Sequence, residues 1–220
     1  MFEIFTIALF GTVLSQAAPG PNLMAVASAG LTTGRKSAVA VAGGVASGVI
    51  IWVTLVALGL GAFIKAYPIS LVALKILGGG YLIYLGLRAL RAAWRGQAVS
   101  IRNDADANGS KGVRLKLGLM AAWRRGLLVV LTNPKAAIMW AAVASYLFGS
   151  GLKPGEVLAF APIGALSAFL IYGTYGVLFS TQTAVSIYAR AARGIEFLFG
   201  VTFGAIGGKL VWDGVRELRS

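Results

Sequence analysis

The chain has 220 residues, of which 58% are hydrophobic and only 12% are charged, and its formal net charge at pH 7 is +13. Its mean hydropathy of +0.81 is far above that of a soluble domain of this length, which indicates an integral membrane protein. Cysteine and histidine are both absent, which excludes disulfides, thiolate or histidine metal sites and a histidine base. We therefore expect neither an enzyme nor a metal protein, and no cofactor.

Six apolar runs follow one another along the chain. About 20 apolar residues cross a bilayer core. Three runs that carry no charge are long enough for this: 4–34, 37–64 and 157–189. Three more are each interrupted by one lysine: 69–90, 126–148 and 197–212. We predict six transmembrane helices, the first of which is not a cleaved signal peptide, because its start carries Glu3 and no Lys or Arg.

The six predicted helices divide into two groups of three. The first half covers residues 1–92, a basic cytosolic linker covers 93–124, and the second half covers 125–220. An odd number of spans in each half makes the halves antiparallel, so helices one and four enter the membrane from opposite faces. The predicted fold class is an all-α membrane protein of two inverted three-helix repeats, in which helices one and four are broken.

Proline marks the two predicted breaks. It frees backbone carbonyls, which in lipid only protein, water or a ligand can satisfy. Half-helix ends offer N–H groups to a carboxylate, while freed carbonyls and amide oxygens accept from an ammonium group, as an amino acid requires. The alternative is that each proline is a kink repacked by its neighbours. We predict a substrate-binding site formed by Gln16, Pro19, Gly20, Pro21, Asn22, Thr132, Asn133, Pro134 and Lys135, with Lys75 as a further candidate.

The lysines within the apolar runs differ in what they indicate. A cation near the bilayer centre costs about 2.5–3.5 kcal/mol, so Lys135 is expected to bind a substrate carboxylate. Its alternative role is to cap freed carbonyls or to snorkel to the cytosolic face. For Lys75, function and snorkelling stay equally open, with no obvious intramembrane carboxylate to pair with it. Glu196 is expected at the cytosolic start of the last helix, where it is a weak candidate for a proton carrier.

The positive charges gather in alternate loops. They occur at Arg35 and Lys36, through the stretch 91–125, and at Arg190 and Arg193. Lys and Arg in short loops mark the cytosolic face, so both termini are predicted outside the cytoplasm, on the outer side of a cytoplasmic (inner) membrane. This distribution argues against nucleic acid as a partner, with the lipid bilayer as the expected surroundings. Glycines four residues apart, at 44 and 48 and at 200 and 204, serve packing within the chain or in a homo-oligomer.

Several of these motifs together resemble the LysE/RhtB family of bacterial exporters. The matching segments cover nearly the whole chain: Ala18-Pro19-Gly20-Pro21-Asn22, Gly34-Arg35-Lys36, residues 74–86, Arg125-Gly126-Leu127 and Asn133-Pro134-Lys135-Ala136. The run at 48–52 is closest to the homoserine/threonine branch. The resemblance implies export of amino acids from the cytoplasm by proton antiport. Some members carry an acid where this chain has Asn22 and Val49, so the resemblance does not supply the ammonium contact or the proton site.

The charge of the predicted site also indicates the type of substrate. It offers one cation and neutral amides but no buried carboxylate, which favours a small neutral amino acid such as threonine or homoserine over lysine. Two alternatives from other classes stay open. One is a membrane protein whose helices merely pack against partners without transport, and the other is an uncoupled channel for small solutes.

Overall fold

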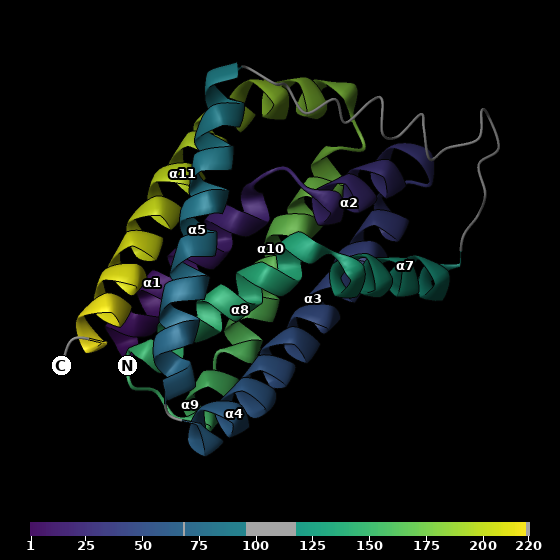
Figure 1. The fold of residues 1–220 in the computed structure, drawn as a ribbon. Coiled ribbons are helices and arrows are strands. Elements are labelled where there is room, and N and C mark those ends of the chain that lie inside the picture. The colour runs from purple at the N-terminus through teal and green to yellow at the C-terminus, as the bar shows by residue number, and fades with distance from the viewer. Residues whose placement is uncertain (68, 96–117, 219–220) are drawn as a thin grey trace.

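The computed structural model describes residues 1–67, 69–95 and 118–218, so most of the predicted linker lies outside the described residues. The described residues form helices and short connections without strands, which confirms the all-α class (Figure 1). The elements are α1 (Phe2–Ala17), α2 (Pro21–Thr32), α3 (Arg35–Leu55), the π-helical turn η1 (Val56–Leu60), α4 (Gly61–Ala66), α5 (Ile69–Arg95), α7 (Leu119–Thr132), α8 (Pro134–Gly149), α9 (Pro154–Leu158), α10 (Ala161–Leu178) and α11 (Gln182–Glu217).

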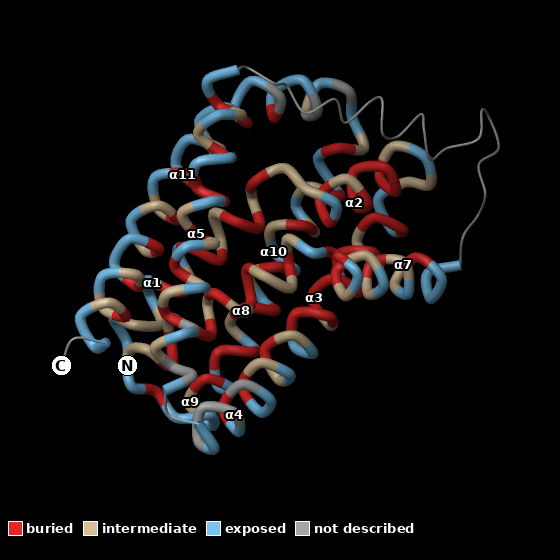
Figure 2. Tube along the Cα trace, in the orientation of Figure 1, coloured by how far each residue is buried: buried red, intermediate tan, exposed pale blue. Residues whose placement is uncertain are grey.

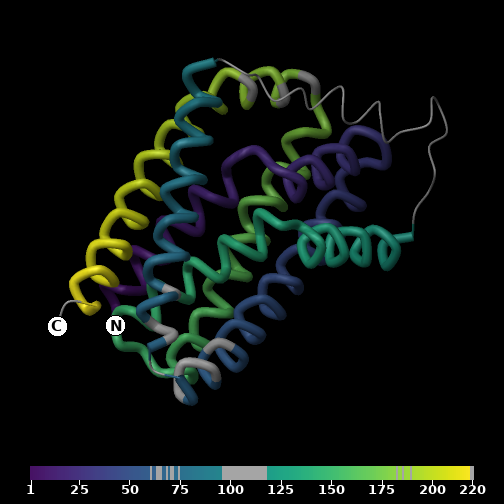
Figure 3. Tube along the Cα trace, viewed as in Figure 1, coloured from purple at the N-terminus to yellow at the C-terminus, as the bar shows by residue number. Residues whose placement is uncertain are grey.

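Both breaks predicted from proline are present. The axes of α1 and α2 differ by 50°, and those of α7 and α8 differ by 63°. Pro21 and Pro134 each occupy the first position of the new helix, where the missing N–H has no partner to lose and the fixed φ suits the helix. Figure 3 shows that both breaks lie away from the two ends of the molecule. Each proline therefore starts a second helix and does not merely kink a continuous one.

Membrane-spanning capacity is distributed over several helices. Among the described residues, three stretches are long and apolar enough to cross a bilayer: Arg35–Gly59, Pro154–Leu178 and Arg190–Glu217. The number rises to five if each bent pair is one span. The 27-residue α5 is about 40 Å long at the usual helical rise and packs along α11. A multi-pass helical membrane protein fits these lengths, whereas the arrangement as six spans stays a prediction.

The boundary between the last two long helices differs from the sequence expectation. The run 157–189 was expected to hold one span, and it does contain most of the apolar stretch Pro154–Leu178. The difference is that α10 ends at Leu178 and α11 already begins at Gln182, within the same run. Thr181 caps α11 by accepting a hydrogen bond from the backbone N–H of Ala184 at 3.4 Å. Arg190 and Arg193, expected in a loop, therefore lie within α11, whose first turns cross the end of α5 (Figure 1). Apolar content alone gave no sign of this turn.

Glycine allows the closest helix contacts in the bundle. A Cβ atom at Gly44 of α3 would overlap the carbonyl oxygen of Trp123 in α7, and one at Gly126 of α7 would overlap that of Val41 in α3. A Cβ atom at Gly200 of α11 would lie 2.8 Å from the carbonyl oxygen of Gly86 in α5. These glycines therefore serve packing within the chain, where buried positions are concentrated between the helices (Figure 2).

We expect Gly44→Ala to destabilise the protein by about 1–3 kcal/mol, the usual range for overpacking a close contact. The adjacent Gly43→Ala is a matched control, because its added Cβ would meet nothing closer than Trp123 Cδ1 at 3.6 Å, an ordinary contact. The measurement is the thermal unfolding temperature and the yield of monodisperse protein in detergent. Equal losses in the two variants would show that the approach of α3 to α7 does not depend on Gly44.

Candidate functional site

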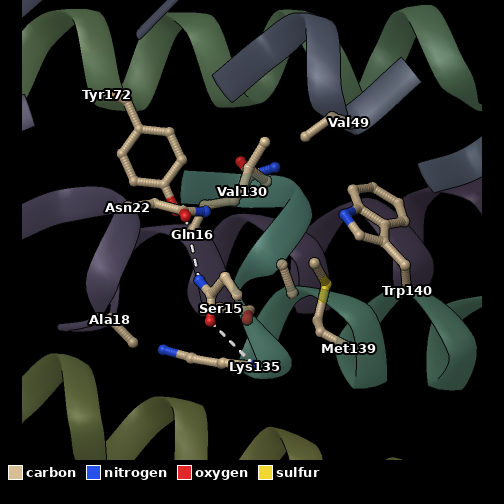
Figure 4. Close-up of a pocket in the computed structure, with 13 residues that line it drawn as sticks. Ser15, Gln16, Ala18, Asn22, Val49, Val130, Lys135, Met139, Trp140 and Tyr172 are labelled. Carbon is tan, nitrogen blue, oxygen red and sulfur yellow. Dashed lines mark hydrogen bonds between the residues drawn. The ribbon is translucent and has the colours of Figure 1, made fainter. Parts of the chain in front are cut away.

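A cavity lies where the two helix breaks meet. Its wall includes five residues that the sequence singled out, namely Gln16, Gly20, Asn22, Asn133 and Lys135 (Figure 4). Apolar side chains from α3, α7 and α8 complete the wall, among them Val49, Val130 and Met139. The cavity volume is about 20 Å³, which is room for a water molecule. The polar groups of both breaks thus face one small internal space.

Two asparagines join the breaks directly. The side-chain nitrogen of Asn133 donates to the side-chain oxygen of Asn22 at 3.1 Å, and Asn22 donates in turn to the hydroxyl of Tyr172 at 3.5 Å. The side-chain oxygen of Asn133 accepts the backbone N–H of Lys135 at 3.0 Å and so caps α8. All three side chains are buried. This chain of bonds links α10, α2 and the start of α8.

Lys135 crosses from the second break to the first. Its ammonium group donates to the carbonyl oxygen of Pro19 at 3.1 Å, a group that no α1 or α2 backbone bond uses. It also lies 5.1 Å from the centre of the Phe199 ring, within range of a cation–π interaction. The side chain lies next to Gly20, where an added Cβ would be 3.5 Å from Nζ, an ordinary contact distance. Capping of a freed carbonyl, the alternative raised for this lysine, is therefore present in the structure.

Gln16 fixes the end of α1 against α10. Its side-chain nitrogen donates to the carbonyl oxygen of Gly164 at 3.4 Å, and its side-chain oxygen accepts from the hydroxyl of Ser167 at 3.0 Å. The Ser167 hydroxyl also lies 2.9 Å from the Gly164 carbonyl, so one proton serves these two acceptors in turn. Gln16 is 3% exposed. A buried amide that faces the cavity thus also holds the first half-helix in place.

Other predicted site residues shape the breaks without lining the cavity. Thr132 is exposed, and its hydroxyl donates to the carbonyl of Leu128 one turn earlier at 2.8 Å, so the structure does not bring it into the cavity. Pro21 and Pro134 are exposed at the starts of α2 and α8. Pro19 contributes its carbonyl oxygen to Lys135, as described above. The polar lining of the cavity therefore comes mainly from the amides and the lysine. Pro21 and Pro134 act by interrupting the preceding helix and starting the next one.

The fold thus combines two bent helix pairs, a polar cavity between them and apolar helices around them. A family model for the LysE type translocators matches residues 13–214, which is most of the chain. The chain belongs to the LysE type translocator family. The resemblance noted from the sequence motifs is thereby confirmed, and the protein is a membrane translocator.

Individual relatives of this translocator are bacterial membrane proteins. An uncharacterized membrane protein of Haemophilus influenzae is 26% identical over 219 residues, with 99% of each chain covered. The threonine efflux protein of Escherichia coli K12 is 26% identical over 214 residues, with 96% of this chain and 98% of the relative covered. The threonine efflux protein of Salmonella typhimurium is similar to the same degree over 211 residues, with the same coverage. No solved structure matches the chain significantly.

Lys75 of the translocator lies outside the cavity. It is 4% exposed, and its ammonium group forms an ion pair of 2.5 Å with Glu217 in the last turn of α11. A Cβ at Gly149 would lie 3.1 Å from Lys75 Cε, so the side chain is packed tightly against the end of α8. The sequence offered no intramembrane carboxylate as a partner for Lys75, and the partner in the structure lies at the end of the last helix. Its partner lies in the C-terminal turn, 142 residues away in the sequence.

Glu196 also differs from the sequence expectation. It lies well inside α11, which begins at Gln182, and it is half-buried. Its carboxylate lies close enough to the Lys135 ammonium for the two charges to attract each other. An acidic group therefore lies within electrostatic reach of the cavity lysine. Sequence reasoning missed this because it placed Glu196 at a helix start.

Three tyrosine hydroxyls form hydrogen bonds at the first helix break that the sequence did not predict. The hydroxyl of Tyr188 donates to the carbonyl oxygen of Ala17, the last residue of α1, at 2.9 Å, and that of Tyr175 approaches the same oxygen at 3.4 Å. Tyr172 faces the cavity and accepts from Asn22, as described above. Aromatic residues in apolar helices usually serve packing alone. The spacing of Tyr175 and Tyr188 therefore gave no indication that both hydroxyls bond the freed carbonyl of Ala17.

Proposed function

We propose that the protein exports small neutral amino acids such as threonine or homoserine from the cytoplasm. The observation that carries this is the composition of the cavity: among the residues that the structure describes, its lining has one ammonium group, several neutral amides and no carboxylate. A substrate with one carboxylate and one ammonium group balances these charges, whereas lysine would add a second ammonium without a partner. Two relatives over nearly the full length of this chain are named threonine efflux proteins, which supports the proposal.

The bonds across the breaks suggest how the substrate binds. Lys135 donates to a neutral carbonyl of Pro19, and a substrate carboxylate is a stronger acceptor because it adds the attraction between two opposite charges to the hydrogen bond. The carboxylate would therefore replace the carbonyl as the partner of Nζ. The substrate ammonium would donate hydrogen bonds to the side-chain oxygens of Asn22 and Gln16. Binding then exchanges contacts between the breaks for contacts with the substrate.

Such an exchange requires the cavity to enlarge, because about 20 Å³ holds a water molecule and no amino acid. We propose that residues 1–92 and 125–220 are two inverted halves that move against each other around the cavity. The contacts between helices support this. If α1 corresponds to α7 and α2 to α8, the α1–α8 contact is equivalent to the α2–α7 contact, and both are present. The corresponding helices α3 and α10 pack on each other, and so do α5 and α11. A two-fold axis between the halves would exchange α3 with α10 and α5 with α11, and would exchange the α1–α8 contact with the α2–α7 contact.

For the orientation we propose that both termini lie outside the cytoplasm. The start of α1 and the end of α11 lie at one end of the molecule, while the end of α5 and the start of α11 lie at the other (Figure 1). Cysteine is absent from the chain, so single cysteines report position cleanly. We expect a membrane-impermeant maleimide to label Glu3→Cys in spheroplasts, and to label Lys36→Cys only after permeabilisation; both positions are exposed. The reverse pattern would contradict the inverted orientation.

Proton coupling is proposed to act through Glu196. Its charge acts on Lys135, so protonation of Glu196 would change how strongly the lysine holds a carboxylate. We expect Glu196→Gln to keep exchange of labelled threonine across the membrane while losing accumulation driven by a pH gradient. Asp213→Asn is the control, because this acid forms its ion pair with Lys209 near the far end of α11. Full gradient-driven accumulation in Glu196→Gln would remove Glu196 as the proton carrier.

The experiment that tests the function is transport by purified protein in proteoliposomes against a panel of amino acids, with and without a pH gradient. We expect uptake of threonine and homoserine that depends on the gradient, with little uptake of lysine. Uptake of the same amino acids unaffected by the gradient would indicate an uncoupled channel. No uptake of any amino acid by folded protein would favour a membrane interaction protein that does not transport.

A further inference from the structure

The indole nitrogen of Trp140 in α8 lacks a hydrogen-bond partner. The residue is 1% exposed, and within the described part of the chain Nε1 is the one buried side-chain nitrogen or oxygen without a partner. Native proteins pair nearly all such groups, because an unpaired buried donor is unfavourable. The arrangement therefore requires an explanation in terms of what else Nε1 binds.

Other indoles in the same bundle are paired. Nε1 of Trp52 donates to the carbonyl oxygen of Val130 at 3.1 Å, and Nε1 of Trp123 donates to the hydroxyl of Ser47 at 3.3 Å. The fold thus supplies acceptors to indoles that are less buried than Trp140. The unpaired state of Trp140 is specific to its position and not a general feature of how tryptophan packs here.

The Trp140 ring is held with its nitrogen toward the cavity between the breaks. Figure 4 shows the nitrogen on the side of the ring that faces Gln16 and Asn22. A Cβ at Gly164 would lie 2.9 Å from Trp140 Cη2, and the ring of Phe160 lies edge-on with centroids 6.4 Å apart, so the ring has little freedom to turn. Beyond it lies a second, wholly apolar cavity lined by side chains such as Val143 and Leu147. That cavity offers no acceptor.

The position of Trp140 relative to Lys135 suggests which part of a ligand it meets. The two residues are five apart in α8, which is about 7.5 Å along the helix axis. A carboxylate bound at Lys135 would leave the other end of the ligand near Trp140. Met139 and Val130 also line the cavity, so the wall combines apolar side chains with polar groups, and the indole N–H is the polar group without a partner. Such a wall fits a side chain with one hydroxyl group.

We propose that Trp140 Nε1 donates a hydrogen bond to the side-chain hydroxyl of the substrate, so that the protein selects hydroxyl amino acids over methyl analogues of the same shape. This inference rests on the proposed export of small neutral amino acids. An apolar pocket separates such analogues poorly, whereas a buried donor left unpaired by the methyl analogue penalises it. Trp140 would thus determine specificity without providing charge.

The test compares threonine with valine, and homoserine with norvaline, in proteoliposomes. We expect the wild-type protein to prefer the hydroxyl member of each pair, and Trp140→Phe to lower that preference by about 2- to 12-fold, the ratio equivalent to one net hydrogen bond. Phenylalanine keeps an aromatic ring but removes the N–H group. Trp212→Phe, at a residue 71% exposed, is the control and should keep the wild-type preference.

Stability provides a second readout. Trp140→Phe removes an unpaired donor, so it should cost only the packing of a fully buried ring, whereas Trp52→Phe also leaves the Val130 carbonyl without its donor. If the wild type transports these amino acids but Trp140→Phe keeps the wild-type preference, the inference is wrong and the proposed function stands. If the wild type transports none of the four amino acids, the proposed function itself fails.

A measurement on the wild-type protein covers the case in which Trp140→Phe does not fold. The chain has five tryptophans, so the indole N–H region of a ¹⁵N–¹H spectrum in detergent contains few signals. We expect threonine to shift an indole signal that valine, at equal occupancy, leaves unchanged. Identical responses to threonine and valine would indicate that Nε1 holds only a resident water, which overturns the inference.

Discussion

Lys135→Met is expected to lower threonine export by about 10- to 150-fold while the protein still folds, the range that corresponds to one hydrogen bond to a charged group. The ammonium of Lys135 contacts the carbonyl oxygen of Pro19 at 3.1 Å and the face of Phe199 at 5.1 Å. Methionine keeps similar length and apolar bulk and places no charge in the membrane. The measurement is efflux of labelled threonine at matched protein level.

Lys209→Met is the matched control for this prediction. Lys209 also lies in an apolar helix, but its side chain is 69% exposed and pairs with Asp213 four residues later. Exposed pairs of this kind contribute little, so both export and the unfolding temperature should stay near the wild-type values. Normal export by Lys135→Met would reduce Lys135 to a cap for the Pro19 carbonyl, which is the contact the structure already contains.

Local chemistry made the helix breaks predictable. Pro21 and Pro134 cannot continue a preceding helix without losing a hydrogen bond, and Asn133 is a favoured residue before a first turn. The class of membrane protein was equally predictable, because apolar run lengths report directly on the bilayer. That the two breaks meet depended on an additional premise, the inverted order of two halves. The bond between Asn22 and Asn133 shows that the breaks do meet, while the inverted order of the halves stays a prediction.

Contacts between distant segments were not predictable from one sequence. Lys75 pairs with Glu217, which lies beyond the last apolar run, at 197–212. The turn between α10 and α11 lies in a stretch with no charge, so run length gave no boundary there. The unpaired donor of Trp140 depends on which acceptors surround it in three dimensions. In each case the missing information is the identity of the neighbours across the bundle, which periodicity and composition do not contain.

The hydrogen bond between the side-chain amides of Asn22 and Asn133 is expected to couple the two breaks energetically. Asn22→Ala leaves the buried amide donor of Asn133 without its acceptor, which should destabilise the protein by about 1–3 kcal/mol. Asn133→Ala should cost a similar amount, plus about 1 kcal/mol for the lost cap on the Lys135 N–H. The double variant should lose less than the sum, because neither amide is then left unpaired.

Asn133→Ser separates the two roles of this side chain. A serine oxygen can still cap α8, but the side chain is too short to donate across the gap to Asn22. We therefore expect Asn133→Ser to be about 1 kcal/mol more stable than Asn133→Ala, yet to lose threonine export to a similar extent. Thermal unfolding and efflux measured on the same preparations give both quantities. Strictly additive losses in the double variant, or full export by Asn133→Ser, would show that the halves hold their breaks in place independently.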